Sequence, residues 1–425
     1  MQTETLYKIY LEFPSIQTDT RKLKKGDLFF ALKGPSFNGN DFTQQALDAG
    51  AAYVIADEDT GINDARIIIT TDALAALQQL AKRHRQSFGI PFIAITGSNG
   101  KTTTKELIHQ VLSCSYKTYT TEGNLNNHIG IPLTILKIKA DAEIAVIEMG
   151  ANHQKEIEAY CDYTMPTHGI ITNCGKAHLE GFGGIEGVRK GKGELFDYIR
   201  KTNGTVFIMN DYNYLKEMSN GITKVVTYGT HDAGITGIIK KSTGFLEVSI
   251  THGASTGNIS TQLVGEYNLP NVLVAVTLGK YFNVADEKIK SALENYTASN
   301  SRSQLIVKGD NKIILDAYNA NPSSMKAAIE NFAKMDGNNK ILMLGGMMEL
   351  GNESLHEHEG ILSLIKNYQW KDVILVGGEY NQLKHPYHYF SNSLEAKEWF
   401  SKQHFTDTQI LIKGSRSMQM EKVLD

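Results

Sequence analysis

The chain has 425 residues, of which 41% are hydrophobic and 21% charged, and its formal net charge is −3. Domains usually hold about 100–200 residues, so two or three globular domains are expected. The small net charge gives no general attraction to nucleic acid or to an anionic membrane. No apolar run reaches the roughly 18 residues of a membrane span. The cysteines, Cys114, Cys161 and Cys174, predict no disulfide framework, and Met1–Tyr10 predicts no signal peptide, so we expect a cytoplasmic protein.

Short β-like runs alternate with helical patterns in the first 89 residues. Strands are predicted at 27–32, 53–56 and 66–70. A helix is predicted over 73–85, where apolar residues recur at helical spacing, and Gly89 and Pro91 end it. We expect residues 1–89 to form one small α/β domain.

The rest of the chain predicts two further α/β domains, at 90–297 and 298–425. Strand-like runs alternate with helical segments in both, which favours parallel sheets with helices on both faces. In the middle domain, strands are expected at 91–96, 143–148, 168–172 and 205–209. The Gly- and Thr-rich stretch 224–263 predicts an antiparallel β extension of that domain. In the last domain, a Rossmann-like doubly wound unit, strands are expected at 312–315, 340–344, 372–376 and 409–412.

A glycine-rich turn, Gly97-Ser-Asn-Gly-Lys-Thr-Thr103, connects the apolar run 91–96 to a predicted helix. Its two glycines allow backbone angles at which successive N–H groups turn inward around phosphate oxygens. Lys101 supplies a cation, and Thr102 a hydroxyl for Mg²⁺, at a helix start whose dipole favours anions. The ordinary P-loop has glycine where Ile95 stands, so this is a shortened form. The predicted nucleotide contacts are Gly97, Ser98, Asn99, Gly100, Lys101, Thr102 and Thr103.

Glu148 ends one predicted strand and His178 follows the next, so both lie at the carboxyl edge of the middle sheet. Doubly wound sheets bind their ligands at that edge. A carboxylate there suits Mg²⁺, which prefers oxygen donors. The alternatives are a solvated loop acid for Glu148 and a structural role for His178, and the residue types alone leave them open.

The Thr-Gly-Ser-Asn-Gly-Lys-Thr-Thr string at 96–103 resembles the Mur ligase superfamily, whose members use ATP to join a carboxylate to an amine. This resemblance implies that His178 holds a second Mg²⁺ ion. It also implies that Lys192 is carbamylated and becomes a carboxylate-like metal ligand, with Lys190 as the alternative. The implied metal ligands are Thr102, Glu148, His178 and Lys192. The implied catalytic residues are Lys101, Glu148, His178, Lys192 and Arg302.

Three longer strings resemble the D-alanyl-D-alanine-adding branch of this superfamily. They are Glu148-Met-Gly-Ala-Asn-His153, Asp316-Ala-Tyr-Asn-Ala-Asn-Pro-Ser-Ser-Met325 and Leu344-Gly-Gly-Met-Met-Glu-Leu-Gly351. In the last string Gly346 stands where the branch has aspartate, and His358 follows downstream. The resemblance implies further nucleotide contacts from Asn271, Arg302, Asp316, Asn319 and Asn321, with Arg302 directed at the γ-phosphate.

Other segments resemble the substrate-binding parts of the superfamily. Residues 19–21, 26–34 and 37–42 look like its UDP-sugar-binding domain, 120–134 like a segment of its cleft, and 412–418 like its C-terminal Lys-Gly-Ser-Arg motif. The implied substrate contacts are Thr20, Arg21, Lys33, Asn38, Asn124, Asn126, Asn127, His358, Lys413 and Arg416. The implied substrates are UDP-MurNAc-tripeptide and D-alanyl-D-alanine, and we expect a monomer.

The resemblance therefore implies an ATP- and Mg²⁺-dependent ligase of peptidoglycan synthesis that works through an acyl phosphate. A hinge at 296–301 is expected to close the site against water. The alternatives within the superfamily are a diamino-acid-adding ligase and a folylpolyglutamate synthase-like enzyme. A P-loop NTPase switch is a third alternative, although it would have the full glycine spacing. An inactive binding protein is a fourth. The joint presence of five residues argues against it: Lys101, Thr102, Glu148, His178 and Lys192.

Overall fold

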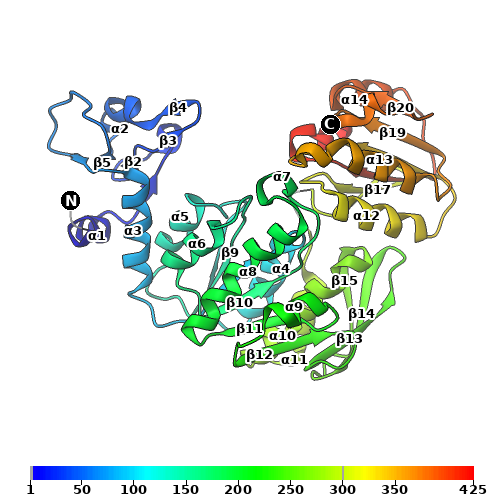
Figure 1. Cartoon of the computed structure of the whole chain (residues 1–425), viewed down its shortest axis with the longest axis horizontal. Helices are drawn as coiled ribbons and strands as arrows, with labels where there is room; N and C mark the ends of the chain where they lie inside the picture. Colours follow the sequence, from blue (N-terminus) through cyan, green and yellow to red (C-terminus); the bar gives the residue numbers. More distant parts are fainter. Residues whose placement is uncertain (1–2, 299–300) are drawn as a thin grey trace. The chain divides into compact units, whose positions relative to one another are not determined.

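The computed structural model describes residues 3–298 and 301–425, and Figure 1 labels its helices and strands. The chain forms two compact units, and both take residues from the predicted middle domain. The first contains the chain up to Ala94, Tyr116–Gly150 and Glu156–Gly169, and the second Ile95–Ser115, Ala151–Lys155 and the chain from Ile170 onward. The expected hinge at 296–301 includes residues 299 and 300, which lie outside the described ranges.

The N-terminal sheet of the first unit is parallel, with the strand order β1-β2-β5-β6. Its strands are β1 (Ile16–Gln17), β2 (Leu28–Phe30), β5 (Tyr53–Ala56) and β6 (Ile67–Ile69). A short antiparallel pair follows β2, formed by β3 (Lys33–Gly34) and β4 (Phe37–Asn38). Phe29 and Val54 are register partners and pack with Leu47 of α2 (Thr43–Asp48). The α/β character and the three strands predicted in this part are confirmed.

Helix α3 (Ala73–Arg85) confirms the predicted helix. The side chain of Asp72 caps it by accepting a hydrogen bond from the backbone N–H of Ala75. Leu77, Leu80 and Ala81 are buried on one stripe of the helix. This helix packs against α1 (Thr3–Glu12), α5 (Gly130–Leu136) and α6 (Glu156–Thr164). The same unit also contains two parallel strands, β8 (Thr118–Thr120) and β9 (Ile144–Glu148).

The longest sheet has the strand order β15-β14-β13-β12-β11-β10-β7-β9-β8. Its other strands are β7 (Phe92–Thr96), β10 (His168–Ile171), β11 (Thr205–Met209), β12 (Lys224–Gly229), β13 (Ile235–Lys241), β14 (Phe245–His252) and β15 (Asn258–Val264). The antiparallel extension is confirmed for β13, β14 and β15. Its expected start at residue 224 is wrong, because β12 pairs in parallel with β11 and with β13. A crossover that contains α9 (Asn213–Met218) connects β11 to β12 and makes this parallel pairing possible.

Several helices of the second unit precede residue 298. They are α4 (Lys101–Ser113), α7 (Leu179–Phe182), α8 (Ile185–Thr202), α9, α10 (Leu269–Tyr281) and α11 (Asp286–Asn295). Those after residue 184 pack against strands of that sheet. Helix α10 is apolar on almost every side and packs against α4, which begins at the phosphate loop. Among the described residues, no helix combines the length and apolar character that crossing a membrane requires.

The sheet at the C-terminal end has the strand order β16-β17-β21-β18-β19-β20. Its strands are β16 (Gln304–Lys308), β17 (Asn311–Asp316), β18 (Lys340–Gly345), β19 (Asp372–Val376), β20 (His388–Phe390) and β21 (Gln409–Lys413). Strand β16 is antiparallel to β17, and the other pairs are parallel. The helices are α12 (Pro322–Lys334), α13 (Ser354–Ile365) and α14 (Ser393–Ser401). The predicted doubly wound unit is thus confirmed.

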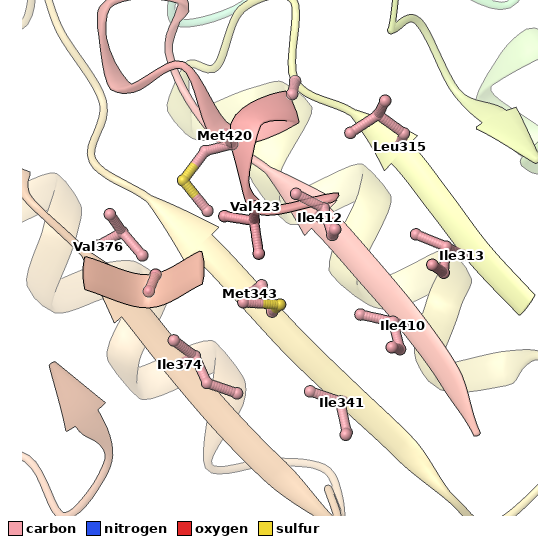
Figure 2. Close-up of a cluster of buried hydrophobic side chains, with 12 residues drawn as sticks. Ile313, Leu315, Ile341, Met343, Ile374, Val376, Ile410, Ile412, Met420 and Val423 are labelled. Atoms are coloured by element: carbon pink, nitrogen blue, oxygen red, sulfur yellow. The ribbon is translucent and has the colours of Figure 1, made fainter. Parts of the chain in front are cut away.

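One core of this domain lies on a single face of its sheet (Figure 2). Side chains two residues apart in a strand point to the same face, so Ile341 and Met343 of β18 lie beside Ile410 and Ile412 of β21. Met420 and Val423, from the short helical turn Met420–Leu424, pack onto this face. A continuous apolar layer therefore holds the central strands in place.

We expect Ile374→Ala to lower the free energy of unfolding of this domain by about 2–5 kcal/mol, because it leaves a cavity in the core. Ile374 is 0% exposed. Both tryptophans, Trp370 and Trp399, lie in this domain, so their fluorescence during urea denaturation reports on it directly. Val307→Ala, at a position 66% exposed, is the control and should change the stability by less than about 0.5 kcal/mol. Equal effects of the two substitutions would contradict the assignment of this core.

Candidate active site

The loop between β7 and α4 has room only for glycine at two positions. Gly97 has φ 140°, and a Cβ there would lie 2.0 Å from Thr172 Oγ1. Gly100 has φ 81°, and a Cβ there would lie 2.8 Å from Asn271 Oδ1. Residues after β10 hold the loop, since Asn173 accepts hydrogen bonds from the backbone N–H groups of Ser98 at 2.9 Å and Asn99 at 3.0 Å. The conformation that the sequence motif predicts is therefore enforced by close neighbours.

The polar groups of this loop and of the start of α4 suit an anion. The N-cap residue of this 13-residue helix is Gly100, which has no side chain to cap it, and the helix dipole favours negative charge there. Lys101 Nζ donates to the carbonyl oxygens of Gly97 at 2.6 Å and Ser98 at 3.3 Å, which keeps the ammonium at the loop. Thr102 is buried beside it, whereas Thr103 is partly exposed.

Asn271 lies behind the loop rather than at its open side. Its side chain is 6% exposed, accepts a hydrogen bond from Thr104 Oγ1 at 3.0 Å and donates to Asn268 Oδ1 at 2.8 Å. Its contact with the Gly100 position shows that it supports the loop backbone. The direct nucleotide contact expected from the sequence stays a prediction.

The structure brings Asn321 to the phosphate loop. Its Nδ2 donates to Asn99 Oδ1 at 2.8 Å, across 222 sequence positions. The same side chain caps α12, because its oxygen accepts a hydrogen bond from the backbone N–H of Ser324. In return, the Ser324 hydroxyl accepts a hydrogen bond from the backbone N–H of Asn321. Two residues that the sequence assigned to the nucleotide from distant motifs are therefore neighbours. Asn319, by contrast, uses its side-chain oxygen locally, on the N–H of Ala320.

Arg302 is placed by an aromatic ring. Its guanidinium lies 3.5 Å from the centroid of the Tyr318 ring, and its Nε is buried without a hydrogen-bond partner among the described residues. The Arg416 guanidinium lies 5.7 Å from the same centroid, and its Nη1 lies 3.7 Å from Glu421 Oε1. Stacking on an aromatic face fixes a guanidinium while leaving its N–H groups able to bind an anion. Tyr318 was not among the predicted site residues, although the Asp-x-Tyr string contains it.

Lys413 lies inside the C-terminal domain. Its Nζ pairs with Asp316 Oδ2 at 2.6 Å and donates to the carbonyl oxygen of Asn319 at 3.3 Å, and its side chain is 2% exposed. Asp316 also accepts a hydrogen bond from the Ser303 N–H at 3.1 Å. The two residues form an ion pair between β17 and β21, in which the Asp316 side chain is 17% exposed. Their expected ligand contacts stay predictions.

His358 is also internal, with 0% exposure. Its Nε2 accepts from the Met347 N–H at 3.0 Å, and its Nδ1 lies 2.7 Å from the carbonyl oxygen of Ser354. Burial lowers the pKa of this imidazole, which fits the neutral tautomer that these bonds require. His358 therefore holds the loop after β18, and its expected substrate contact stays a prediction. A Cβ at Gly346 in this loop would lie 2.5 Å from Gly378 Cα, so the aspartate of the resembling motif has no room here.

His178 and Glu349 face each other in unusual backbone conformations. His178 Nδ1 lies 2.5 Å from Glu349 Oε2, and the facing ring lowers the pKa of the Glu349 carboxyl. Both residues have positive φ, 53° for His178 and 63° for Glu349. Such conformations are uncommon for residues other than glycine and cluster at functional sites. His178 is thereby held by a carboxylate that the sequence did not identify as its partner.

Lys192 is buried on α8, with 1% exposure. Its Nζ donates to the carbonyl oxygen of Ala151 at 2.8 Å and lies 4.8 Å from the centroid of the Phe182 ring. Its rival Lys190 is exposed on the same helix. Protein groups therefore enclose Lys192, whereas solvent reaches Lys190. The carbamylation of Lys192 stays a prediction.

Glu148 ends β9 in the first unit and is 1% exposed. Its Oε1 accepts from Asn126 Nδ2 at 2.7 Å, so two predicted site residues meet. Asn127 instead accepts from the N–H groups of Ile129 and Gly130 at the start of α5, and Asn124 is exposed. Among the described residues, no group of at least three His, Cys, Asp or Glu side chains is arranged to hold a metal. The expected metal site draws on a hydroxyl and a modified lysine as well.

Two residues of the N-terminal part that are expected to contact UDP already bind acidic side chains. Lys33 Nζ lies 2.9 Å from Glu58 Oε1 and 3.0 Å from Asp57 Oδ1, and these partners raise the pKa of Lys33. Asn38 Nδ2 donates to Glu58 Oε2 at 2.8 Å. An incoming diphosphate would compete with these carboxylates.

Arg21 and Thr20 have local partners too. Arg21 donates from Nε and Nη2 to the Asp19 carboxylate at 2.8 Å each, and this lowers the pKa of Asp19 to about 2. The Arg21 side chain nevertheless remains 85% exposed. Thr20 donates to Gln45 Oε1 at 3.2 Å. The Arg21 guanidinium is thus open to solvent although it pairs with Asp19.

The loop geometry predicts a severe effect of Gly97→Ala. A methyl group there needs an unfavourable φ and would overlap Thr172 Oγ1, so we expect the affinity for an ATP analogue to fall at least about tenfold. Isothermal titration calorimetry measures this. Gly360→Ala on α13, where nothing lies within 4 Å of the added Cβ, is the control and should bind like the wild type.

The environments of the cysteines predict selective alkylation. Burial raises the pKa of Cys174 to about 12, whereas Cys114 is exposed. Because the thiolate is the reactive form, iodoacetamide at pH 8 should modify Cys114 and leave Cys174 unmodified in the folded protein. Peptide mass spectrometry locates the label. Labelling of Cys174 in native Cys114→Ala protein would contradict this description.

Comparison with known proteins identifies all three segments of the chain. Residues 12–92 match the Mur ligase family catalytic domain, residues 95–279 the Mur ligase middle domain, and residues 301–416 the Mur ligase glutamate ligase domain. The UDP-N-acetylmuramoyl-tripeptide–D-alanyl-D-alanine ligase of Bacillus subtilis is 34% identical, over 96% of this chain and 92% of its own length.

Solved structures agree with these matches. MurF from Acinetobacter baumannii superposes with a TM-score of 0.86 at 29% identity, over 96% of this chain and 92% of its own. The MurF ligase from Thermotoga maritima in complex with ADP superposes with a TM-score of 0.87 at 26% identity, over 97% of both chains. Since the family domains cover most of the sequence in order, the chain belongs to the Mur ligase family.

Proposed function

We propose that this chain uses ATP to join the free carboxylate of UDP-MurNAc-tripeptide to the amine of D-alanyl-D-alanine. The observation that carries the proposal is the 34% identity, over 96% of the chain, to an enzyme named for that reaction. We assign residues 1–89 to the UDP-linked substrate, 90–297 to ATP and metal, and 298–425 to the nucleotide and the incoming dipeptide. The product is UDP-MurNAc-pentapeptide for peptidoglycan synthesis.

The phosphate loop supports the proposed ATP site. Its N–H groups and the start of α4 would bind the phosphates, with Lys101 neutralising the charge that develops on the transferred group. Asn99 and Asn321 already form one hydrogen-bonded pair at this loop. Arg302, stacked on Tyr318, supplies a second cation, which we assign to the γ-phosphate.

The proposed metal ligands are Thr102, Glu148, His178 and Lys192. The hydroxyl, carboxylate and imidazole are donors that Mg²⁺ sites use, and carbon dioxide added to Lys192 Nζ would supply a second carboxylate-like group. The near-complete burial of Lys192 supports that modification. Bound Mg²⁺ would supply electrostatic stabilisation of the phosphates.

The proposed chemistry has two bond exchanges. The substrate carboxylate oxygen forms a bond to the γ-phosphorus as the bond from that phosphorus to the β-phosphate oxygen breaks, which releases ADP. The amine nitrogen of the dipeptide then attacks the acyl carbon, loses a proton and expels phosphate, which leaves the amide. Water would destroy the acyl phosphate, so the residues around it must exclude solvent during the reaction.

We propose that the enzyme acts in the cytoplasm as a monomer. Arg21 in the N-terminal part and Arg416 in the C-terminal domain are the exposed cations that we assign to the UDP-linked substrate and to the dipeptide carboxylate, respectively. Asn124, Asn126 and Asn127 are assigned to the substrate side of Glu148.

The direct test is phosphate release from ATP with Mg²⁺ and UDP-MurNAc-tripeptide, with and without D-alanyl-D-alanine. We expect release that depends on both substrates and a product heavier by one dipeptide, seen by mass spectrometry. Release that requires a free diamino acid or glutamate instead would assign the chain to another branch of the family. Release from ATP alone would favour a switch-type NTPase.

Lys101→Ala should lower kcat by about 10²–10³-fold, because it removes a cation directed at developing charge. The control is Lys326→Ala on α12, whose side chain is 64% exposed and which should turn over like the wild type. Equal rates for the two variants would remove Lys101 from the proposed mechanism.

A further inference from the structure

The segment 174–180, which follows β10, connects the phosphate loop to the C-terminal domain, and two of its connecting residues, Gly175 and Lys176, have no assigned ligand role. Gly175 exchanges two hydrogen bonds with Ser98 of the phosphate loop, at 2.9 and 3.0 Å. The next residue, Lys176, donates its backbone N–H to Ser323 Oγ on α12 at 2.9 Å. A Cβ at Gly175 would lie 2.9 Å from that same oxygen, so the approach is as close as glycine permits.

The side chain of Lys176 makes a second connection, to α13. Its Nζ lies 2.6 Å from Glu357 Oε1, across 181 sequence positions. The Glu357 side chain is only 11% exposed, whereas that of Lys176 is 52% exposed. In the described part of the chain, this carboxylate has no second hydrogen-bond partner. A carboxylate so far removed from water depends strongly on its one cation.

A third connection follows two residues later. His178 faces Glu349, and the N–H of Glu180 donates to the carbonyl oxygen of Glu349 at 3.4 Å. Glu349 precedes α13, and Glu357 lies within it. The segment 174–180 is therefore bound to the C-terminal domain at Ser323, at Glu357 and at Glu349.

We infer that Lys176 and Glu357 are positioning residues for ligation. Their ion pair holds α13 against the segment that carries His178 and braces the phosphate loop through Gly175. When the pair is intact, the groups that we assign to the phosphates and to the metal are assembled in one arrangement. The inference rests on the proposed function, because it concerns the rate of that reaction.

The test compares single substitutions with a charge exchange. Lys176→Ala and Glu357→Gln should each lower kcat at least about tenfold, since small misplacements of reacting groups cost about that much or more. The dissociation constant of UDP-MurNAc-tripeptide, measured by calorimetry, should stay within about twofold, because no residue assigned to that substrate contacts the pair. The double variant Lys176→Glu/Glu357→Lys restores an ion pair of opposite polarity and should recover kcat to within about threefold of the wild type.

A matched control separates positioning from stability. Lys280 pairs with Asp286 at 2.7 Å, with side-chain exposures of 35% and 15%, and lies outside the site. Lys280→Ala breaks a comparable pair and should leave kcat unchanged. Melting temperatures of all variants identify any that unfold, and Lys176→Arg, which keeps the charge, should retain near wild-type kcat.

The outcomes distinguish this inference from the proposed function. If the wild type does not ligate the two substrates, the proposed function fails. If the wild type ligates them but folded Lys176→Ala and Glu357→Gln keep wild-type kcat, the inference alone is overturned. A folded charge-exchange variant that is as slow as the single variants would also overturn it, because restored pairing would then not restore the rate.

Discussion

The close approach of Gly97 to the end of β10 is the constraint on which the rest of the site depends. A side chain at position 97 would overlap Thr172 Oγ1, so the loop can follow only one path past that strand. Along this path Asn173 binds the N–H groups of Ser98 and Asn99, and Ser98 binds Gly175. The conformation of the phosphate loop and that of the following segment are thereby determined together. A ligand that binds the phosphate loop would therefore also affect the segment after β10.

Most of the fold could be predicted from the sequence because buried parallel strands are apolar and short. The runs at 205–209, 340–344 and 372–376 all became strands, and the motif at 97–103 does join a strand to a helix. The predicted start of the antiparallel extension at residue 224 was wrong, because β12 pairs in parallel with both neighbours. The alternation of residue types along a strand does not reveal the direction of the strands beside it. Pairing direction depends on the crossover containing α9, which is a property of tertiary structure.

The candidate site was harder to predict, for a different reason. Motifs indicate which residues are candidates for a site, but they do not show whether those side chains already form hydrogen bonds or ion pairs within the protein. Lys413 lies in a Lys-Gly-Ser-Arg string that suggests an exposed cation, yet Asp316 binds it inside the domain. His358 likewise has both ring nitrogens occupied. Tyr318 and Glu349 were present in the quoted strings, but their partners Arg302 and His178 are distant in sequence.

The position of β21 has a consequence for how the C-terminal domain is made. This strand comes after all the others in sequence but lies between β17 and β18 in the sheet. On a nascent chain emerging from a ribosome, β17 and β18 therefore have no common neighbour until residues 409–413 are released. Each strand exposes an unpaired edge during that interval, and such edges attract other strands. Until residues 409–413 are released, the half-made domain is thus open to pairing with strands of other chains.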